Sequence, residues 1–341
     1  MISIVIINFN GERFINNCLN SILASHYRNF EVFIVDNNST DQSREILQNY
    51  QSHPKIKLIY LRQNIGPAYA RNLAAQKAQG GYLVFLDYDT IVDKDWLIKA
   101  ISYLEQNPNI GAGQLKILKM GTNIYDCAGE KLTPFGFLAE RARSASDRGQ
   151  FNKVTDIFSG KTAAMIVKKS VFEEVDGFDK DFFIYWEEPD LCWRVWKTGL
   201  RVVFLPMGKV WHAYGTKEKP VSAKQATLIT RQGCRNQIMT IIKNGVGFSG
   251  LRMLISAILA WFGLMILFII KLDFAKATAV GKAFFWLLKR PKFLWQKRKT
   301  VKKRLGERFG SDAEWLPKVS VQQGIKWYLG KGISFVLGQP Y

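Results

Sequence analysis

The chain has 341 residues, of which 48% are hydrophobic, and its formal net charge is +20. This length and apolar content suffice for one large folded domain with an appendage, and they exclude a chain that is disordered throughout. The positive charge indicates an anionic partner, such as a phosphorylated substrate, an anionic lipid surface or a nucleic acid.

The cysteines and the N-terminus favour a cytosolic location. Residues 1–10 lack the charged start and long apolar run of a secretory signal peptide. Four cysteines are scattered without the spacing of a metal site, which is typical of reduced thiols. They are Cys18, Cys127, Cys192 and Cys234.

Repeated strand-and-helix units are predicted at the start of the chain. The apolar runs 2–7, 30–35 and 56–61 predict buried strands, and helical spacing follows the first at 14–24 and the third at 68–78. With a fourth strand near residue 82, this spacing is typical of a doubly wound, mostly parallel sheet. Every loop after a strand carries Asn, Asp or Gly, which predicts one site at one edge of the sheet.

The fourth strand ends on two carboxylates. A mostly apolar, β-favouring run at 81–86 is followed by Asp87 and Asp89. Oxygen ligands suit a hard divalent cation such as Mg²⁺ or Mn²⁺, which can also bind a diphosphate. The alternative is a turn with two solvated aspartates.

Residues 91–150 show weaker patterns. A helix is predicted at 96–104 and a strand at 111–118, whereas 126–147 predicts a mobile loop that faces an acceptor. The alternative for this loop is a merely solvated surface. Its candidate ligands for a carrier diphosphate are Arg141, Arg143 and Arg148.

A second group of acids begins a helix that is predicted to reach Lys197. Pro189 suits the first helical turn, and the helix dipole favours ionised carboxylates beside it. Such a carboxylate suits a general base. A plain N-terminal preference for negative charge explains one acid there but not all three, which are Glu187, Glu188 and Asp190.

Six ordered motifs together resemble family 2 glycosyltransferases, over roughly residues 1–215. They lie at 4–11, 35–41, 64–72, 87–89 (Asp-Tyr-Asp, similar to the family's DxD motif), 159–164 together with 177–179, and 185–194. The resemblance implies the GT-A fold, a nucleotide-sugar donor, a divalent metal ion and inversion at the anomeric carbon. It is strongest to the rhamnosyltransferase-like branch, which builds surface polysaccharides on polyprenyl-diphosphate carriers.

The resemblance also implies a nucleotide site. It places Asp36 on the base and Asp87 near the ribose or the metal ion. Arg71 is a candidate phosphate contact, with a helix–strand salt bridge as the alternative, and Gly66 either approaches the phosphate or serves only as a turn residue. Further candidate contacts to the nucleoside are Asn8, Asn10 and Asn38.

The catalytic residues follow from the same resemblance. Family members usually have Glu-Asp where this chain has Glu-Glu, and Glu188 falls at the position of the general base. Glu187 is the alternative base, and Asp190 is a third candidate unless it caps the helix or pairs with Arg194.

A strand predicted at 202–205 precedes His212, one of only three histidines in the chain. The resemblance has His212 complete the metal shell of Asp87 and Asp89, as the family's late histidine does. A histidine of the core or the surface is the alternative.

From about residue 216 the chain changes character. Residues 216–250 are predicted to be a connecting helical segment, and 251–341 a hydrophobic and basic membrane-associating region after a catalytic domain at 1–215. Residues 253–270 carry no charge and would extend about 27 Å as a helix. Residues 271–308 hold thirteen Lys/Arg and two Asp/Glu, a net charge of +11. Because a full crossing would oppose the positive-inside tendency, an in-plane or re-entrant hairpin is favoured over a crossing.

The predicted function is therefore that of an inverting, metal-dependent hexosyltransferase with Mn²⁺ or Mg²⁺ as cofactor. Its expected partners are a nucleotide-sugar donor, a lipid-linked saccharide acceptor and the anionic cytoplasmic face of the cell membrane, and no nucleic acid. The QxxRW motif of processive synthases is absent from the sequence, which favours addition of a single sugar. The alternative is a catalytically silent, glycosyltransferase-like binding protein tethered to membrane or nucleic acid.

Overall fold

The computed structural model describes residues 1–213, 222–310 and 322. The strands are β1 (Ile2–Asn8), β2 (Phe30–Asp36), β3 (Ile56–Tyr60), β4 (Tyr82–Asp87), β5 (Thr90–Val92), β6 (Ile110–Lys119), β7 (Tyr125–Cys127), β8 (Glu130–Leu132), β9 (Leu138–Glu140), β10 (Thr155–Asp156), β11 (Ala164–Lys168) and β12 (Arg201–His212). The helices are α1 (Ile15–Leu23), α2 (Ser43–Gln48), α3 (Pro67–Lys77), α4 (Ile98–Gln106), α5 (Lys169–Glu174), α6 (Glu187–Lys197), α7 (Ala223–Asn244), α8 (Gly247–Ile270), α9 (Phe274–Leu288) and α10 (Pro291–Leu305), with a short 3₁₀ helix at Gly306–Gly310.

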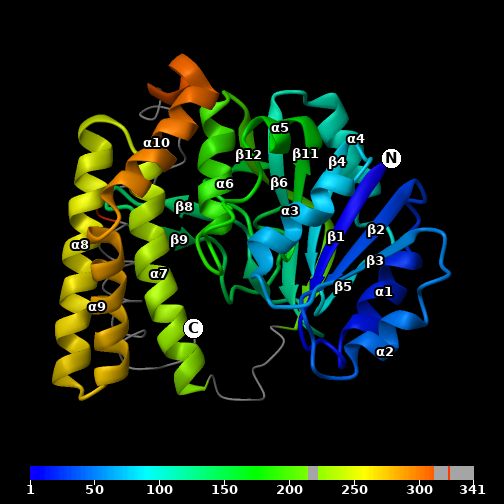
Figure 1. Cartoon of the computed structure of the whole chain (residues 1–341). Helices are drawn as coiled ribbons and strands as arrows, with labels where there is room; N and C mark the ends of the chain where they lie inside the picture. The colour runs from blue at the N-terminus through cyan, green and yellow to red at the C-terminus, as the bar shows by residue number, and fades with distance from the viewer. Residues whose placement is uncertain (214–221, 311–321, 323–341) are drawn as a thin grey trace.

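A central sheet occupies one half of the molecule (Figure 1). Its main path runs β10-β12-β6-β11-β4-β1-β2-β3, with β5 added on β12 and β7 on β6. Strands β3, β2, β1 and β4 are mutually parallel, β11 runs antiparallel between β4 and β6, and β6 and β12 are parallel again. The predicted mixed α/β fold with a mostly parallel sheet is confirmed.

Each face of the sheet has its own hydrophobic core. In β1, Ile4 and Ile6 join the cluster that contains α1 and α4, whereas Val5 and Ile7 join the cluster that contains α3, α5 and α6. This alternation follows from the two-residue period of a strand. It buries β1 on both faces, as its continuous apolar run predicts. All four cysteines are buried and free.

Strand β12 is longer than the sequence predicts. The predicted strand ends at Leu205, but β12 continues to His212 past a register shift between Leu205 and Lys209. Gly208 has φ +74°, and a Cβ there would lie 2.2 Å from the carbonyl oxygen of Trp96. Beyond this bulge β12 also pairs with β5, and His212 lies opposite Thr90. The bulge therefore brings His212 to the end of β4.

The segment predicted as a mobile loop at 126–147 contains ordered strands instead. β7 pairs with β6, and β8 pairs with β9 in a separate two-stranded sheet. Asp126 has no exposed surface. Arg143 lies 2.6 Å from Glu140, so its charge is already paired. Strands of three residues are too short to give a recognisable period, which explains the wrong prediction.

Four helices, α7 to α10, form a layer beside α6 (Figure 1). Lys243 of α7 forms ion pairs with Asp179 at 2.6 Å and with Asp190 at 2.7 Å, and Lys297 of α10 reaches Asp179 at 2.6 Å. One hydrophobic cluster continues from the sheet through α6 into α7, α8 and α9. The predicted domain boundary at 215 lies outside the described residues, and the one at 250 falls within α8.

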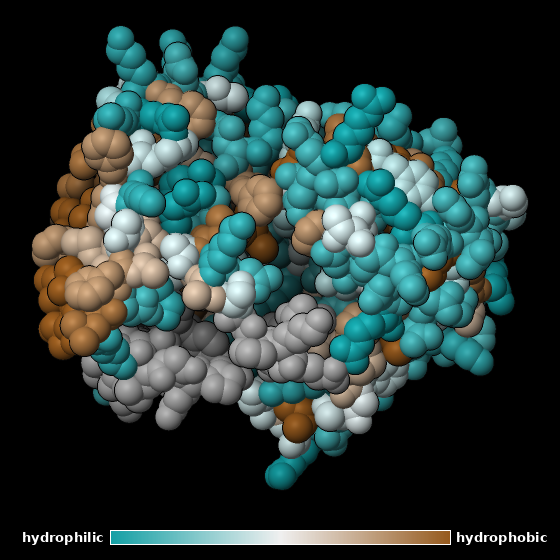
Figure 2. Space-filling model, turned by 60° about the horizontal axis from the view of Figure 1, so that its bottom comes forward, coloured by the Kyte–Doolittle hydropathy of each residue, from teal (hydrophilic) through white to brown (hydrophobic). Residues whose placement is uncertain are grey.

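Among the described residues, α8 is the one helix long and apolar enough to cross a membrane, and 22% of its apolar window is buried in the protein. Large apolar side chains cluster along the outer edge of the helical layer, at the left of Figure 2. On α8 the most exposed include Phe248, Leu251, Leu259 and Ile270. Length and composition alone do not distinguish a helix that crosses a bilayer from one that lies on it.

Candidate active site

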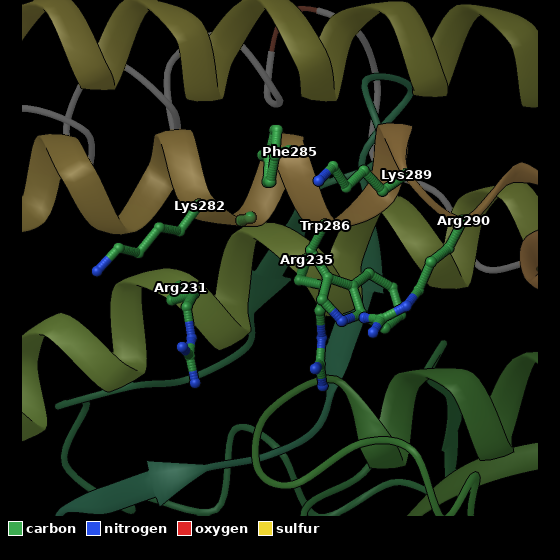
Figure 3. Close-up of a pocket in the computed structure, with 8 residues that line it drawn as sticks. Arg231, Arg235, Lys282, Phe285, Trp286, Lys289 and Arg290 are labelled. Atoms are coloured by element: carbon green, nitrogen blue, oxygen red, sulfur yellow. The ribbon is translucent and has the colours of Figure 1, made fainter.

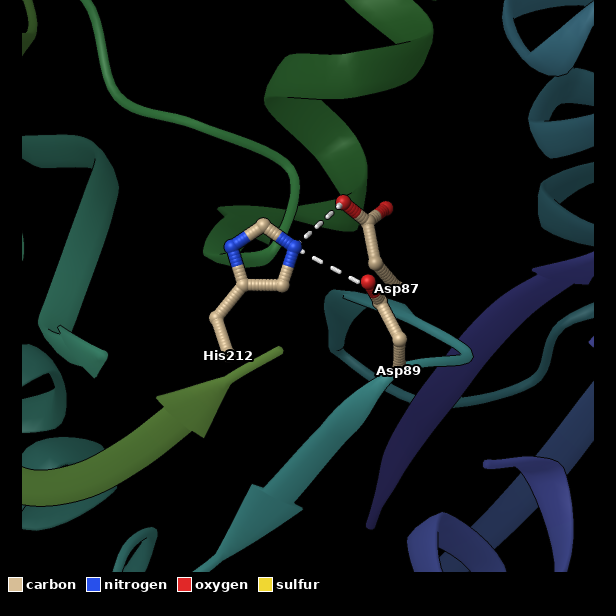
Figure 4. Close-up of side chains that lie close together, drawn as sticks. All are labelled: Asp87, Asp89 and His212. Carbon is tan, nitrogen blue, oxygen red and sulfur yellow. Dashed lines mark ion pairs between the residues drawn. The ribbon is translucent and has the colours of Figure 1, made fainter. Parts of the chain in front are cut away.

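Three predicted metal ligands meet at one edge of the sheet (Figure 4). Asp87 ends β4, Asp89 follows it, and His212 ends β12. The Nε2 atom of His212 lies 3.3 Å from Oδ1 of Asp89 and 3.9 Å from Oδ2 of Asp87. One ligand atom from each residue lies within 4.8 Å of the others. Ligands that each lie about 2.1 Å from one ion show similar separations, so the three residues fit a divalent cation.

A third carboxylate orients the histidine. Oδ2 of the buried Asp126 lies 3.0 Å from Nδ1 of His212. Because a carboxylate only accepts, Nδ1 donates, and Nε2 is directed at Asp87 and Asp89. A histidine that binds a metal ion usually donates its other N–H in this way. Burial disfavours the charged imidazole, but hydrogen bonds to Asp126 and Asp89 outweigh it and raise the pKa of His212 to about 10.

Arg71 of α3 links the metal cluster to α6. Its guanidinium lies 3.1 Å from Asp87 and 3.4 Å from Glu187, and its side chain is almost fully buried. Arg71 therefore forms a salt bridge, which was the alternative to a phosphate contact. The bridge joins α3 to Asp87 and Glu187, which lie in two motifs that are far apart in the sequence. A phosphate contact of Arg71 stays a prediction.

The two glutamates that begin α6 have different surroundings. Glu187 is buried, and burial together with the charge of Glu188 raises its pKa to about 8. Glu188 is half-buried. Its Oε1 accepts hydrogen bonds from the hydroxyl of Thr162 at 2.8 Å and from the backbone N–H of Thr162 at 3.3 Å. Only Glu188 combines partial exposure with a fixed orientation.

Asp190 lies in a buried ion-pair network. Its carboxylate lies 2.7 Å from Arg194 and 2.7 Å from Lys243, and it accepts a hydrogen bond from Asn244 at 2.8 Å. With no exposed surface, Asp190 cannot meet an acceptor in this conformation. The structure thus brings Glu187 and Glu188 to the site. Asp190 instead joins α6 to α7 through Lys243 and Asn244, and it forms the predicted pair with Arg194 within α6.

The backbone before α6 is strained. Tyr185 and Trp186 both lie in the left-handed region, with φ of 68° and 70°. The side-chain amide of Asn236 in α7 donates hydrogen bonds to the carbonyls of Ile184 and Tyr185 at 3.0 and 2.8 Å. Non-glycine residues in this conformation cost about 1–3 kcal/mol each and persist where neighbours enforce them. Helix α7 therefore helps to fix the direction of Glu187 and Glu188.

The predicted nucleoside contacts lie where β1 and β2 end. Asp36 is fully buried, and it accepts hydrogen bonds from Asn8 at 3.0 Å, from the backbone N–H of Ser39 at 3.1 Å and from Arg44 at 2.7 Å. Burial opposes the carboxylate, but the hydrogen bonds outweigh it and lower the pKa of Asp36. Asn8 is equally buried, so it supports Asp36 from below in this conformation.

Two further asparagines shape the loops above these strands. Asn10 and Asn38 have φ of 53° and 68°, a conformation that asparagine tolerates well. Oδ1 of Asn10 accepts a hydrogen bond from the backbone N–H of Thr40 at 2.8 Å and so ties the loop after β1 to the loop after β2. The roles of Asn10 and Asn38 in nucleoside binding stay predictions.

Residues 3–176, about half of the chain, match the family model described as "Glycosyl transferase family 2". The chain belongs to glycosyl transferase family 2.

Solved structures share the fold of this family 2 glycosyltransferase. GalNAc-T7, solved with UDP, GalNAc and Mn²⁺, has a TM-score of 0.57 at 16% identity and covers 71% of this chain and 48% of its own. Staphylococcus aureus TarS 1–349, solved with UDP-GlcNAc, has a TM-score of 0.55 at 16% identity and covers 100% of this chain and 93% of its own. These identities support the fold alone, and the predicted GT-A fold is confirmed.

Among curated proteins, a poly-β-1,6-N-acetyl-D-glucosamine synthase of Staphylococcus epidermidis is 24% identical over 212 residues. The match covers 62% of this chain and 49% of the synthase. The chain spans less than half the length of the curated relatives it matches.

Gly66 of this glycosyltransferase has a clear structural role. It precedes α3 with φ +83°, and a Cβ there would lie 2.5 Å from the carbonyl oxygen of Phe183. Glycine is therefore needed for the loop before α3 to touch the segment before α6. Whether Gly66 also approaches a phosphate stays a prediction.

Sequence reasoning missed two residues of the site. Asp126 lies in a three-residue strand inside the supposed loop, so no periodicity marks it. Thr162 lies within the family motif at 159–164, but the spacing of that motif does not indicate a hydrogen bond to Glu188. Asp126 could have been recognised as a partner of His212 only if the bulge in β12 had been foreseen.

Proposed function

We propose that this chain moves one hexose from a nucleotide-sugar donor to a saccharide acceptor on a polyprenyl-diphosphate carrier, with inversion, in cell-surface polysaccharide synthesis. The observation that carries the proposal is the convergence of Asp87, Asp89 and His212 beside Glu187 and Glu188. The polysaccharide synthase relative and the UDP-GlcNAc complex of a similar fold support it. The rhamnosyltransferase-like branch stays a prediction.

The residues at the strand ends fit a donor diphosphate with a divalent ion. Asp87, Asp89 and His212 would hold Mn²⁺ or Mg²⁺, and the Mn²⁺ in the GalNAc-T7 structure supports this assignment. The ion would act as a Lewis acid that neutralises the charge developing on the leaving diphosphate. Asp126 keeps His212 oriented. Asp36 is fully buried in this conformation, so its contact with the base of the nucleotide stays a prediction.

Glu188 suits the general base. Its carboxylate would accept the proton of the acceptor hydroxyl while that oxygen bonds to the anomeric carbon and the bond to the diphosphate breaks on the opposite face. Hydrogen bonds from Thr162 hold Glu188 in one orientation. Glu187 is less suited because it is buried and bound by Arg71, and because burial and the charge of Glu188 raise its pKa.

The packing of α8 supports attachment to the membrane surface rather than a crossing. One apolar stripe of α8, which includes Met253, Ala257 and Phe268, is buried against the protein. The opposite stripe, which includes Ile255 and Leu259, is exposed. Because the helix packs on the layer along its length, it can lie in the membrane plane with its outer stripe in lipid. The basic residues that follow it suit the anionic cytoplasmic face.

A donor screen tests the proposal directly. The full chain in mild detergent is heated with UDP-, GDP- and dTDP-sugars, each with Mn²⁺, Mg²⁺ or EDTA. One donor at about 100 times its Kd should stabilise the fold by about 2.7 kcal/mol in the presence of the metal ion. The stabilising donor should then release its nucleoside diphosphate when a saccharide acceptor is added. A full set of donors that leaves the melting temperature unchanged contradicts the proposed function.

A further inference from the structure

A cationic pocket of about 600 Å³ lies between α7 and α9, outside the candidate active site (Figure 3). Two aromatic side chains, Phe285 and Trp286, line it together with cations from both helices and from the turn after α9. Its cations are Arg231, Arg235, Lys282, Lys289 and Arg290.

Among the described residues, this pocket carries an excess of positive charge. No carboxylate lines it, and within the part of the chain that the structure describes none of its five cations forms an ion pair with Asp or Glu. The guanidinium of Arg235 donates instead to the backbone carbonyl of Asp181 at 2.8 Å and to the side-chain oxygen of Asn236 at 2.9 Å. Burial, and then the charge of Arg231, lower the pKa of Arg235 to about 10, although the nearby charges of Asp181 and Asp179 act in the opposite direction. Crowded like charges favour a bound anion.

Aromatic contacts hold several of these cations in place. The guanidinium groups of Arg235 and Arg290 lie 4.9 and 4.5 Å from the ring centre of Trp286, and the ammonium of Lys289 lies 4.3 Å from that of Phe285. Cation–π contacts of this kind orient a charged group without neutralising it. The pocket is thus arranged for phosphate oxygens before any ligand binds.

One side of the pocket borders an apolar surface, and the other side contacts the segment that leads into α6. Phe285 and Leu288 of α9 are exposed, by 58% and 78%, and continue the apolar outer surface of the layer. On the other side, Arg235 and Asn236 bind the carbonyls of the segment 181–185, which leads directly into α6. A ligand with an anionic head and a hydrocarbon tail matches both sides.

We infer that this pocket binds the diphosphate head of the lipid-linked acceptor, while its hydrocarbon chain lies on the apolar surface of α8 and α9. The identity of the lipid as the acceptor rests on the proposed function. The pocket would then set the depth at which the acceptor saccharide approaches Glu188. It adds a phosphate subsite on the acceptor side, separate from the metal cluster that faces the donor.

Binding of a short prenyl diphosphate tests the inference. The full chain in non-ionic detergent is titrated with farnesyl diphosphate, inorganic pyrophosphate and farnesol, and heats of binding are recorded. Farnesyl diphosphate should bind at least about tenfold more tightly than either part alone, because charge-assisted hydrogen bonds and apolar burial act together. Equal affinity for pyrophosphate, or for farnesol, overturns the inference.

A charge-matched pair of variants locates the site. Arg231→Glu/Lys282→Glu reverses two exposed pocket cations, and Lys299→Glu/Lys303→Glu makes the same charge change on the exposed surface of α10. The pocket variant should lose at least about tenfold in affinity for farnesyl diphosphate, and the α10 variant less than about threefold. Equal losses overturn the inference. If the pocket variant melts early, Lys289→Glu/Arg290→Glu replaces it with the same expectation.

Two further measurements complete the test. The first asks whether the bound phosphate belongs to a prenyl diphosphate or to bulk lipid, and the second distinguishes this inference from the proposed function. Phosphatidylglycerol vesicles should not displace farnesyl diphosphate at equal phosphate concentration, and displacement would assign the pocket to bulk lipid instead. Stabilisation by the nucleotide sugar should be unchanged in both variants. A failed donor screen with intact prenyl-diphosphate binding counts against the proposed function alone, and the reverse result counts against the pocket alone.

Discussion

The acidic cluster at the sheet edge and the cationic pocket of the helical layer differ in how their charges are paired. At the sheet edge, Arg71 and His212 lie among the carboxylates, so the protein supplies much of the countercharge. In the pocket between α7 and α9, the five cations of the described structure face aromatic rings and backbone carbonyls but no carboxylate. The first region thus pairs most of its charges internally, whereas the second has cations without a paired carboxylate among the described residues.

The largest expected effect is loss of Asp89, a proposed metal ligand. Asp89→Asn should reduce transfer by about 10³-fold or more, because a bound ion contributes several kcal/mol to stabilising the leaving charge. Initial rates with Mn²⁺ measure this loss, and the matched control Asp95→Asn changes an exposed aspartate on a nearby loop. If Asp89→Asn keeps the rate of the control and EDTA does not lower that rate, the proposed metal site at the sheet edge is wrong.

Glu188→Gln should have the next largest effect, a loss of about 10²–10⁴-fold in transfer, because the amide keeps the shape and hydrogen-bonding atoms but cannot take a proton. Donor stabilisation should be unchanged, which separates the base from the donor site. Glu187→Gln is the matched control. Should Glu187→Gln be inactive while Glu188→Gln works normally, the base lies one residue upstream.

A smaller loss, of about 10–100-fold, is expected for Asp126→Asn, since Asp126 acts through His212 and not on the substrate. The variant should need more Mn²⁺ for half-maximal activity, and excess Mn²⁺ should restore much of the rate. A merely structural role of Asp126 predicts a lower melting temperature with no change in the Mn²⁺ requirement.

The smallest effect is expected when salt is added to the membrane-bound protein. Raising the ionic strength from about 0.1 to 1 M shortens the Debye length from about 10 to 3 Å, which weakens contacts of exposed cations with anionic lipid. The exposed apolar stripe of α8 does not depend on charge, so most of the protein should still sediment with membranes. Release by salt alone would assign the attachment to the cations instead of α8.

The sequence predicts the sheet-edge site better than the helical layer for a physical reason. Strand β4 is a short apolar run with acids directly after it, and the topology of parallel strands then places Asp87 and Asp89 at the shared edge. The contact of His212 with Asp89 depends on the bulge at Gly208, which the local sequence presents only as a break in the strand. The motif therefore indicates which residues meet at the sheet edge without the geometry that joins them.

In the helical layer, composition reveals the charge but not its arrangement. The excess of basic residues after residue 270 is visible in the sequence, whereas the pocket also requires Arg231 and Arg235, about fifty residues earlier on α7. No local pattern indicates that α7 and α9 pack side by side. Pairing of distant helices is a tertiary property that periodicity alone does not report.

The two left-handed residues before α6 bear on how this enzyme would respond to selection for heat resistance. Glycine at position 185 would adopt the φ of 68° without a Cβ penalty, so randomised libraries screened at high temperature should recover it. Relief of strain near a reacting group usually trades stability against turnover. Survivors with glycine at 185 would therefore hold α6 less tightly and be slower catalysts, which makes this short turn a poor starting point for industrial stabilisation.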